Sequence, residues 1–132
     1  MEGSVKDLAK YRLENAQEDL ERAKRELDIG DYKLSLNRSY YAIFHAIRAV
    51  NILDEFDSSK HSGVIAHFNQ YHVKTGDFDK EISKIITSAM NIRQKSDYDD
   101  FFIALKSDAV SQFQEAEKIL ESVTKYINEN ID

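Results

Sequence analysis

Apolar residues recur in alternating steps of four and three at both ends of this chain, the spacing of one buried helix face. Near the N-terminus they are Ala9, Leu13, Ala16, Leu20, Ala23 and Leu27. Near the C-terminus they are Leu105, Ala109, Phe113, Ala116, Leu120, Val123 and Ile127. These patterns predict helices over residues 4–29 and 102–128. Gly30 is placed to end the first helix and Asp31 to cap the next one.

The segment 32–53 is apolar on nearly every face, which predicts a helix at the centre of its domain. One of its faces keeps the spacing of a core stripe yet includes polar residues. The members of that face are Leu34, Arg38, Tyr41, His45, Arg48 and Ile52.

Two further helices are predicted between the central helix and the last one, over residues 60–72 and 79–95. His61 falls among the inward positions of the first of these. The segment 96–100, rich in Ser and Asp, is expected to break the second, because these side chains compete for backbone hydrogen bonds. Since the loops are short and no domain boundary is evident, residues 1–132 are predicted to form a single all-α domain, an antiparallel four- to five-helix bundle.

Composition narrows the classes of function. The chain has no Cys, so disulfides and thiolate zinc sites are excluded, and no Pro. Its 24 acidic and 18 basic residues give a net charge of -6, which argues against non-specific binding along a nucleic-acid backbone. No apolar run has the length of a membrane span, and the first residues lack the apolar stretch of a signal peptide. We therefore expect a cytoplasmic protein that does not enter a membrane.

The first candidate site is the face that carries Arg38, Tyr41 and His45. Arg38 and His45 are seven residues apart, about 10 Å along a helix, with Tyr41 between them. An arginine could bind phosphate there and a histidine could transfer a proton. The alternative is that Tyr41 and His45 are core or interface residues and that Arg38 and Arg48 pair with carboxylates. Spacing alone favours this alternative.

The second candidate site is the end of the helix predicted over residues 79–95. Arg93 continues an isoleucine face there, followed by Asp97 and Tyr98. An arginine on an apolar face needs a partner, because an unpaired buried charge is unfavourable. Either Arg93 and Asp97 form a purely structural ion pair, or Asp97 holds the guanidinium at a cleft to which Tyr98 adds a hydroxyl. The sequence supports these two interpretations equally.

The four histidines, His45, His61, His67 and His72, raise the question of a metal site. Their spacing matches no compact ligand motif, and His67 is predicted to lie on the opposite helix face from His61. No glycine-rich phosphate loop is present either. We therefore expect neither a bound metal nor a cofactor.

The run from Leu36 to Ala46, LNRSYYAIFHA, resembles the signature of the second helix in small HEPN proteins, roughly R-x-Y-Y-A-x-F-x-A. The later blocks His61-Ser-Gly63-Val-Ile65 and Arg93-Gln-Lys-Ser-Asp97-Tyr98 follow in the order of that family. The resemblance covers about residues 19–116. It implies a four- or five-helix bundle, usually a homodimer, that is commonly paired with a minimal nucleotidyltransferase in bacterial and archaeal systems of the toxin–antitoxin type.

Many HEPN proteins are metal-independent ribonucleases, and their motif is an arginine followed after four to six residues by a histidine. At the corresponding place this chain has Arg93-x4-Tyr98, without a histidine. A phenol has a pKa of about 10, so Tyr98 is a poor general base at neutral pH. Arg38-x6-His45 fits the spacing but lies in the middle of a helix.

The resemblance therefore implies first a HEPN subunit that dimerises and binds a nucleotide or a nucleotidyltransferase partner through a polar cleft. Its contact residues would be Arg38, Tyr41, Arg93 and Asp97, and the partner could nucleotidylate the Tyr98 hydroxyl. A ribonuclease whose site combines Arg93 and Tyr98 with His45 and Arg38 is the second hypothesis. A purely structural helical interaction module is the third.

Overall fold

The structure, a computed structural model, describes residues 2–131 of the chain. The elements within that range are all helical, as the hydrophobic pattern predicts, and no strand is present among them. They are α1 (Glu2–Asp28), α2 (Tyr32–Ile52), α3 (His61–Phe68), the π-helical turn η1 (Asn69–Val73), α4 (Lys80–Tyr98) and α5 (Lys106–Asn130). None of these helices is long and apolar enough to cross a membrane.

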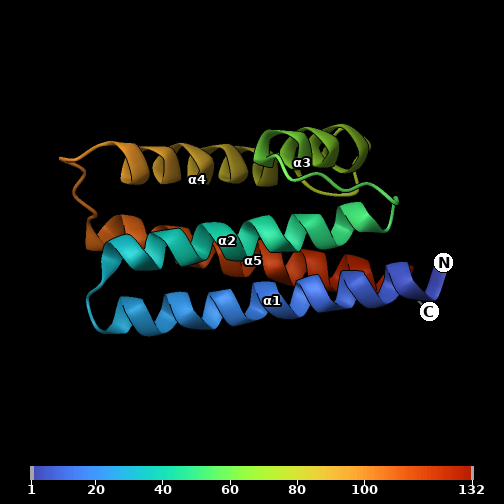
Figure 1. The fold of residues 1–132 in the computed structure, drawn as a ribbon, viewed down its shortest axis with the longest axis horizontal. Coiled ribbons are helices and arrows are strands. Elements are labelled where there is room, and N and C mark those ends of the chain that lie inside the picture. Colours follow the sequence, from blue (N-terminus) through green and yellow to red (C-terminus); the bar gives the residue numbers. More distant parts are fainter. Residues whose placement is uncertain (1, 132) are drawn as a thin grey trace.

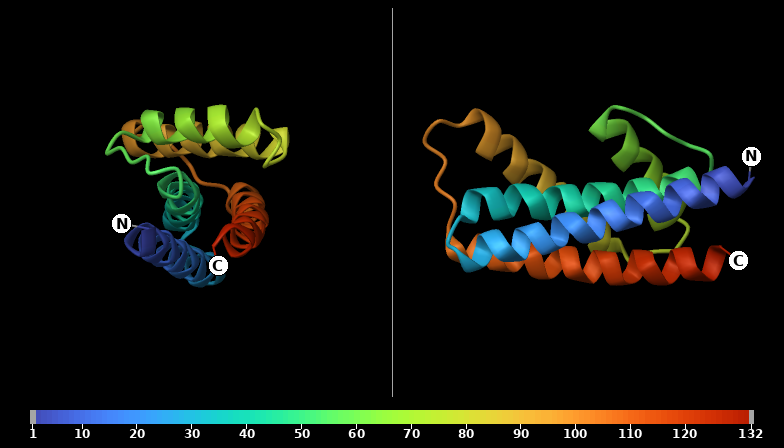
Figure 2. Two further views of the ribbon diagram at one scale, coloured as in Figure 1. Left: turned by 90° about the vertical axis from the view of Figure 1, so that its right-hand side faces the viewer. Right: turned by 60° about the horizontal axis from the view of Figure 1, so that its bottom comes forward.

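The helices form two layers (Figure 1). The long helices α1, α2 and α5 pack as a three-helix bundle, and α3, η1 and α4 lie across one side of it, as the end-on view in Figure 2 shows. Helix α2 contacts α1, α3, α4 and α5, so it is the central helix that its apolar faces predict. The chain reverses direction between α1 and α2, which gives the antiparallel arrangement expected of short connections.

Local signals set the start of α2. Gly30 has a φ of +83°, a left-handed conformation that favours glycine and ends α1. The carboxylate of Asp31 then accepts a hydrogen bond of 3.2 Å from the backbone N–H of Leu34. Asp79 caps α4 in the same way, accepting from the N–H of Glu81 at 3.1 Å.

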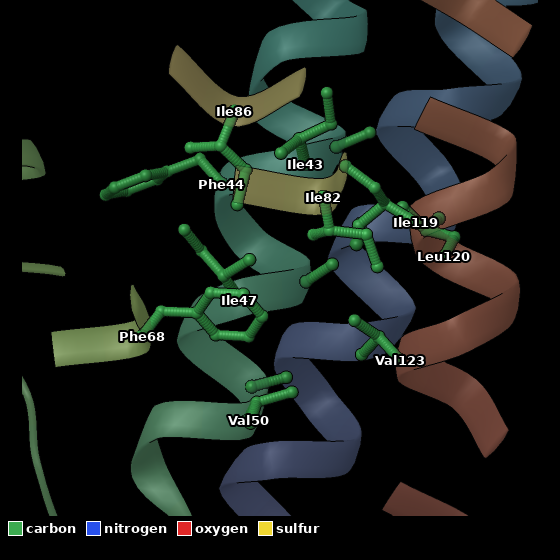
Figure 3. Close-up of a cluster of buried hydrophobic side chains, with 14 of the residues drawn as sticks. Ile43, Phe44, Ile47, Val50, Phe68, Ile82, Ile86, Ile119, Leu120 and Val123 are labelled. Carbon is green, nitrogen blue, oxygen red and sulfur yellow. The ribbon is translucent and has the colours of Figure 1, made fainter. Parts of the chain in front are cut away.

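The hydrophobic core lies where the two layers meet along α2 (Figure 3). Its labelled members come from every layer of the fold: Ile43, Phe44, Ile47, Val50, Phe68, Ile82, Ile86, Ile119, Leu120 and Val123. Two buried amides tie other elements to α2 through the backbone. Asn51 Nδ2 donates to the carbonyl of Val64 at 3.0 Å, and Gln112 Nε2 donates to the carbonyl of Leu36 at 2.9 Å. Buried polar groups with such partners fix one arrangement of the helices.

Three boundaries differ from the prediction by more than two residues. The helix expected over residues 60–72 is α-helical only as far as Phe68 and continues as the π-helical turn η1. Helix α4 does not break at residue 96, because Ser96 is buried; it ends at Tyr98, and the Asp99 carboxylate accepts from the N–H of Phe101 at 2.9 Å. The last helix begins at Lys106, four residues after the expected start.

Candidate functional site

Arg93 of α4 lies over two tyrosine rings of α2. Its guanidinium carbon is 5.3 Å from the ring centre of Tyr40 and 5.5 Å from that of Tyr41, within cation–π range. Its Nε is 3.5 Å from the Asp97 carboxylate, one turn further along α4. That Nε is buried and makes no hydrogen bond to any residue in the range 2–131. Asp97 therefore holds the guanidinium by charge, and the hydrogen-bonding capacity of Nε remains unused.

His61, the first residue of α3, belongs to the same cluster. Its Nδ1 is 2.6 Å from the hydroxyl of Tyr40, and its ring stacks on Phe44 with 4.1 Å between ring centres. Burial raises the pKa of Tyr40 to about 12, although the charge of Arg93 opposes the shift. The phenol therefore keeps its proton at neutral pH and can donate it to Nδ1, which leaves Nε2 of a neutral His61 ring as the N–H group.

Arg38 and His45 lie beside this cluster, toward α1, where they share the carboxylate of Asp19 on α1. His45 Nε2 is 3.5 Å from Asp19, and Arg38 is 4.0 Å from both Asp19 and Glu26. Asp19 is buried and also accepts a hydrogen bond of 3.1 Å from Arg22. Burial raises the pKa of Glu26, and Arg38 is the main group that opposes this shift. Arg38 is thus paired with carboxylates, as the structural alternative expects.

A third polar group joins α1, α2 and the connection that follows α2. The Asp57 carboxylate accepts hydrogen bonds from Arg12 at 2.8 Å and from Arg48 at 2.9 Å. Burial would raise the pKa of Asp57, but these two hydrogen bonds outweigh it and lower the pKa to about 2. Asp57 therefore fixes Arg48 beside the Phe44 ring, 5.8 Å from its centre.

Replacing Asp57 with asparagine is expected to lower the free energy of unfolding by about 1 kcal/mol at pH 7. The pKa shift alone would correspond to a larger loss of unfolding free energy, but the Asp57 side chain is 45% exposed and solvent weakens the interaction. Because the folded-state pKa lies below that of the unfolded chain, the contribution is complete above about pH 4 and is lost as the pH falls toward 2. Urea denaturation of the parent and of Asp57→Asn at pH 7 and pH 3 measures the difference in unfolding free energy at each pH.

The matched control for that experiment is Asp100→Asn, at an exposed carboxylate near the end of α4. Its effect on the unfolding free energy is expected to stay within about 0.5 kcal/mol. An Asp57→Asn effect that is equal at pH 7 and pH 3 would contradict the assignment of the low pKa.

The pKa values of His45 and His61 are both lowered, mainly by burial. At His45 the charge of Asp19 opposes the shift, and Arg48 and Arg12 add to it. At His61 the neighbours Arg93, Arg48 and His45 all lower the pKa further. The charged side chains that act on His61 are thus arginines, so its neighbourhood is electropositive although the whole chain is acidic.

The predicted site residues divide into three places. Arg93, Asp97 and Tyr41 come together at the α2–α4 contact, whereas Arg38 and His45 gather around Asp19 on the α1 side of α2. The Tyr41 ring lies between the two groups, 6.1 Å from the ring of His45 and 6.0 Å from that of His61. Tyr98 is 84% exposed, so its hydroxyl faces solvent outside both groups.

Sequence reasoning did not single out His61, Asp19 or Asp57 as site residues. Each comes from a helix or loop other than α2, so no spacing within one helix could reveal it. The one available signal was the position of His61 at the head of the second resembling block. We define the electropositive cluster as Tyr41, Arg48, His61 and Arg93, with Asp97 at its edge.

The electropositive cluster is chemically suited to a phosphate group. Guanidinium groups bind phosphate oxygens through paired N–H donors, and the Nε atoms of Arg48 and Arg93 are both buried without a hydrogen-bond partner among residues 2–131. His61 adds a neutral imidazole. A separate group of possible metal ligands, Asp54, His67 and His72, lies where α2 ends against α3 and η1.

Comparison with known proteins gives one family and several relatives. The model of the HEPN domain matches residues 9–128. "Putative toxin MJ0142" of Methanocaldococcus jannaschii is 31% identical over 120 residues, which cover 90% of this chain and 82% of that protein. "Putative toxin MJ0605" of the same organism is 33% identical over 117 residues, which cover 89% of this chain and 87% of that protein. A "UPF0332 protein" of Thermotoga maritima is 31% identical and covers 92% of each chain.

Proposed function

Since the chain belongs to the HEPN domain family, we propose that it is the toxin-type HEPN subunit of a prokaryotic two-protein system. Two similar proteins of an archaeon carry the word toxin in their names. The proposed partner is a minimal nucleotidyltransferase, and the proposed place of action is the cytoplasm. The HEPN subunit would bind a nucleotide or this partner through the electropositive cluster.

One observation carries this proposal: the way in which Arg93 is held. Two tyrosine rings and one carboxylate fix its guanidinium, yet its buried Nε has no hydrogen-bond partner among the described residues. A guanidinium that served only to pair with Asp97 would gain most from a direct hydrogen bond, and the 3.5 Å separation is too long for a strong one. The Arg93 side chain is 23% exposed, so a phosphate group could accept hydrogen bonds from the terminal nitrogens of its guanidinium.

The proposed subunit is a homodimer, and the segment around the α4–α5 connection is the surface that we propose for it. Four large apolar side chains are exposed there: Tyr98, Phe101, Ile103 and Leu105. A monomer rarely leaves such a group of neighbouring apolar side chains in water. A second copy would cover them and bring the two electropositive clusters onto one assembly, since Arg93 lies little more than one turn before Tyr98.

The test of the partner is co-expression of the chain with a nucleotidyltransferase encoded by a neighbouring reading frame. With an affinity tag on the nucleotidyltransferase, the two proteins are expected to co-purify in a fixed ratio through gel filtration. Growth of the bacterial host is expected to slow when the chain is expressed alone and to recover when the partner is present. Separate elution of the two proteins would refute the partner.

Cleavage of RNA is a second candidate function, favoured by the position of His61. An arginine that holds the phosphate and an imidazole that transfers a proton are the pair that metal-independent cleavage needs. His61 would serve once its hydrogen bond with Tyr40 is released, because only the other tautomer leaves Nε2 free to accept a proton. The purified chain would then cleave RNA in the presence of EDTA, and His61→Asn would abolish cleavage whereas His45→Asn would not. Intact RNA after incubation with the parent chain would exclude this activity.

A further inference from the structure

A carboxylate and two imidazoles converge at the end of α2 that is remote from Tyr32. Oδ2 of Asp54 is 2.9 Å from Nε2 of His67 and 2.6 Å from Nε2 of His72. One ligand atom from each of these side chains lies within 4.8 Å of the other two. We propose that Asp54, His67 and His72 bind one divalent transition-metal ion of the zinc type.

The π-helical turn creates this convergence. His67 and His72 are five residues apart, and at about 100° per residue an α-helix would direct them about 140° apart. In η1 the backbone instead closes with a bond between residues five apart, and Lys74 N donates to the carbonyl of Asn69 at 2.9 Å. One turn then contains the five residues, so both imidazoles face the same carboxylate. Single π-turns inside helices occur frequently at functional sites.

The second nitrogen of His72 has the partner that metal-binding histidines commonly have. Its Nδ1 is 3.2 Å from Oδ2 of Asp77, while its Nε2 faces Asp54. A neutral imidazole has one N–H group and cannot donate to both carboxylates. With a metal ion on Nε2, the N–H is at Nδ1 and donates to Asp77, which is the carboxylate–histidine–metal arrangement. The pairing with Asp77 thus selects the ring form that binds a metal.

The three proposed ligand side chains need to move little to accept an ion. Zinc bonds of about 2.0–2.2 Å to nitrogen and oxygen place tetrahedral ligand atoms about 3.4 Å apart. The two Asp54–histidine distances of 2.9 and 2.6 Å would therefore open by less than about 1 Å. Rings on either side hold His67 in place, since Phe56 stacks on it at 4.0 Å and Tyr71 lies at 4.6 Å.

The chemistry of the ligands selects the class of ion. Two imidazoles and one carboxylate are typical of zinc and of ferrous sites, whereas calcium and magnesium prefer oxygen ligands alone. His72 is almost fully buried, but the Asp54 side chain is 33% exposed. A fourth coordination position is therefore open to water on the Asp54 side. The ion would fasten the end of α2 to α3 and η1.

The test is titration of the EDTA-treated chain, freed of chelator, with zinc chloride in a calorimeter. One zinc ion per chain is expected to bind with a dissociation constant below about 10 µM, and cobalt chloride is expected to give the visible absorption bands of a four-coordinate site. His67→Gln is expected to weaken zinc binding at least hundredfold, and Asp77→Asn tenfold to hundredfold. The control, His45→Gln, removes a histidine outside this group and is expected to bind zinc like the parent.

Circular dichroism in EDTA shows whether each variant is folded before the titration. If His67→Gln does not fold, the parent chain and Asp77→Asn still decide the question. Absence of zinc binding by the folded parent chain would overturn the proposal. Binding by folded His67→Gln as tight as that of the parent would also overturn it.

Discussion

Replacing Arg93 with glutamine is expected to weaken binding of ATP to the chain between tenfold and hundredfold. Hydrogen bonds between a guanidinium and a phosphate are charge-assisted, and the loss of one such interaction corresponds to about 1.5–3 kcal/mol. The effect is large at this residue because two tyrosine rings and Asp97 fix its position before any ligand arrives. Isothermal titration with ATP at constant salt measures it.

Two other substitutions show what the arginine contributes. Arg93→Lys keeps the charge but loses the planar fork, so its affinity for ATP is expected to fall between those of the parent and Arg93→Gln. Arg25→Gln removes an exposed arginine near the end of α1 and is the matched control, with an affinity expected to stay within about twofold of the parent. An equal loss of ATP affinity in Arg25→Gln and Arg93→Gln would show that ATP binding depends only on the net charge of the chain.

Arg93→Met separates the proposed function from a purely structural role. Methionine keeps an apolar side chain over the rings of Tyr40 and Tyr41 and removes the partly buried charge. If Arg93 has a purely structural role, the stability of Arg93→Met is expected to be nearly unchanged or raised. In that case neither the parent nor the variant would bind ATP. The proposed function predicts a folded protein that has lost affinity for ATP. Thermal melts and titrations of the same sample distinguish the two.

Replacing Phe68 with alanine is expected to lower the free energy of unfolding by about 3–5 kcal/mol. Phe68 is fully buried where the layer of α3, η1 and α4 meets α2 (Figure 3). Its ring centre is 5.0 Å from that of Phe78. Removal of the ring leaves a cavity that the rigid helices on both sides cannot close. For a chain of this length the melting temperature is expected to fall by about 10–20 °C.

The same substitution at Phe101, which is 89% exposed, is the control. Phe101→Ala is expected to change the unfolding free energy of the monomer by less than about 0.5 kcal/mol. Urea denaturation at low protein concentration compares the two variants without a contribution from self-association. Similar effects at the two positions would mean that the two layers are not coupled through Phe68.

The fold could be predicted where a local rule decides the structure. Steps of four and three located α1 and α5, apolar residues on all faces placed α2 at the centre, and Gly30 and Asp31 set the boundary between two helices. The layer formed by α3, η1 and α4 was less predictable. A π-turn has no signature in composition, and the end of α4 depended on the burial of Ser96, which is a tertiary effect.

The candidate site could be predicted only within single helices. The partnership of Arg93 with Asp97 follows from their spacing, and the shared face of Arg38 and His45 follows from a helical period. The contact between His61 and Tyr40 and the common carboxylate of Asp57 join residues from different elements. Such contacts depend on how the layers pack, so a single sequence carried no pattern for them.

The π-turn also has a consequence for how the family's sequences are compared. A π-turn is equivalent to an α-helix with one inserted residue, so deletion of a single residue between Phe68 and Lys74 would restore a regular helix. If the lost residue lies between His67 and His72, the two histidines become four residues apart in a regular helix, about 40° apart and still on one face. Relatives with a one-residue gap between the two histidines are therefore expected to keep paired imidazoles. Relatives that keep the interval of five residues but form a regular helix are expected to direct the imidazoles about 140° apart and to lack the cluster.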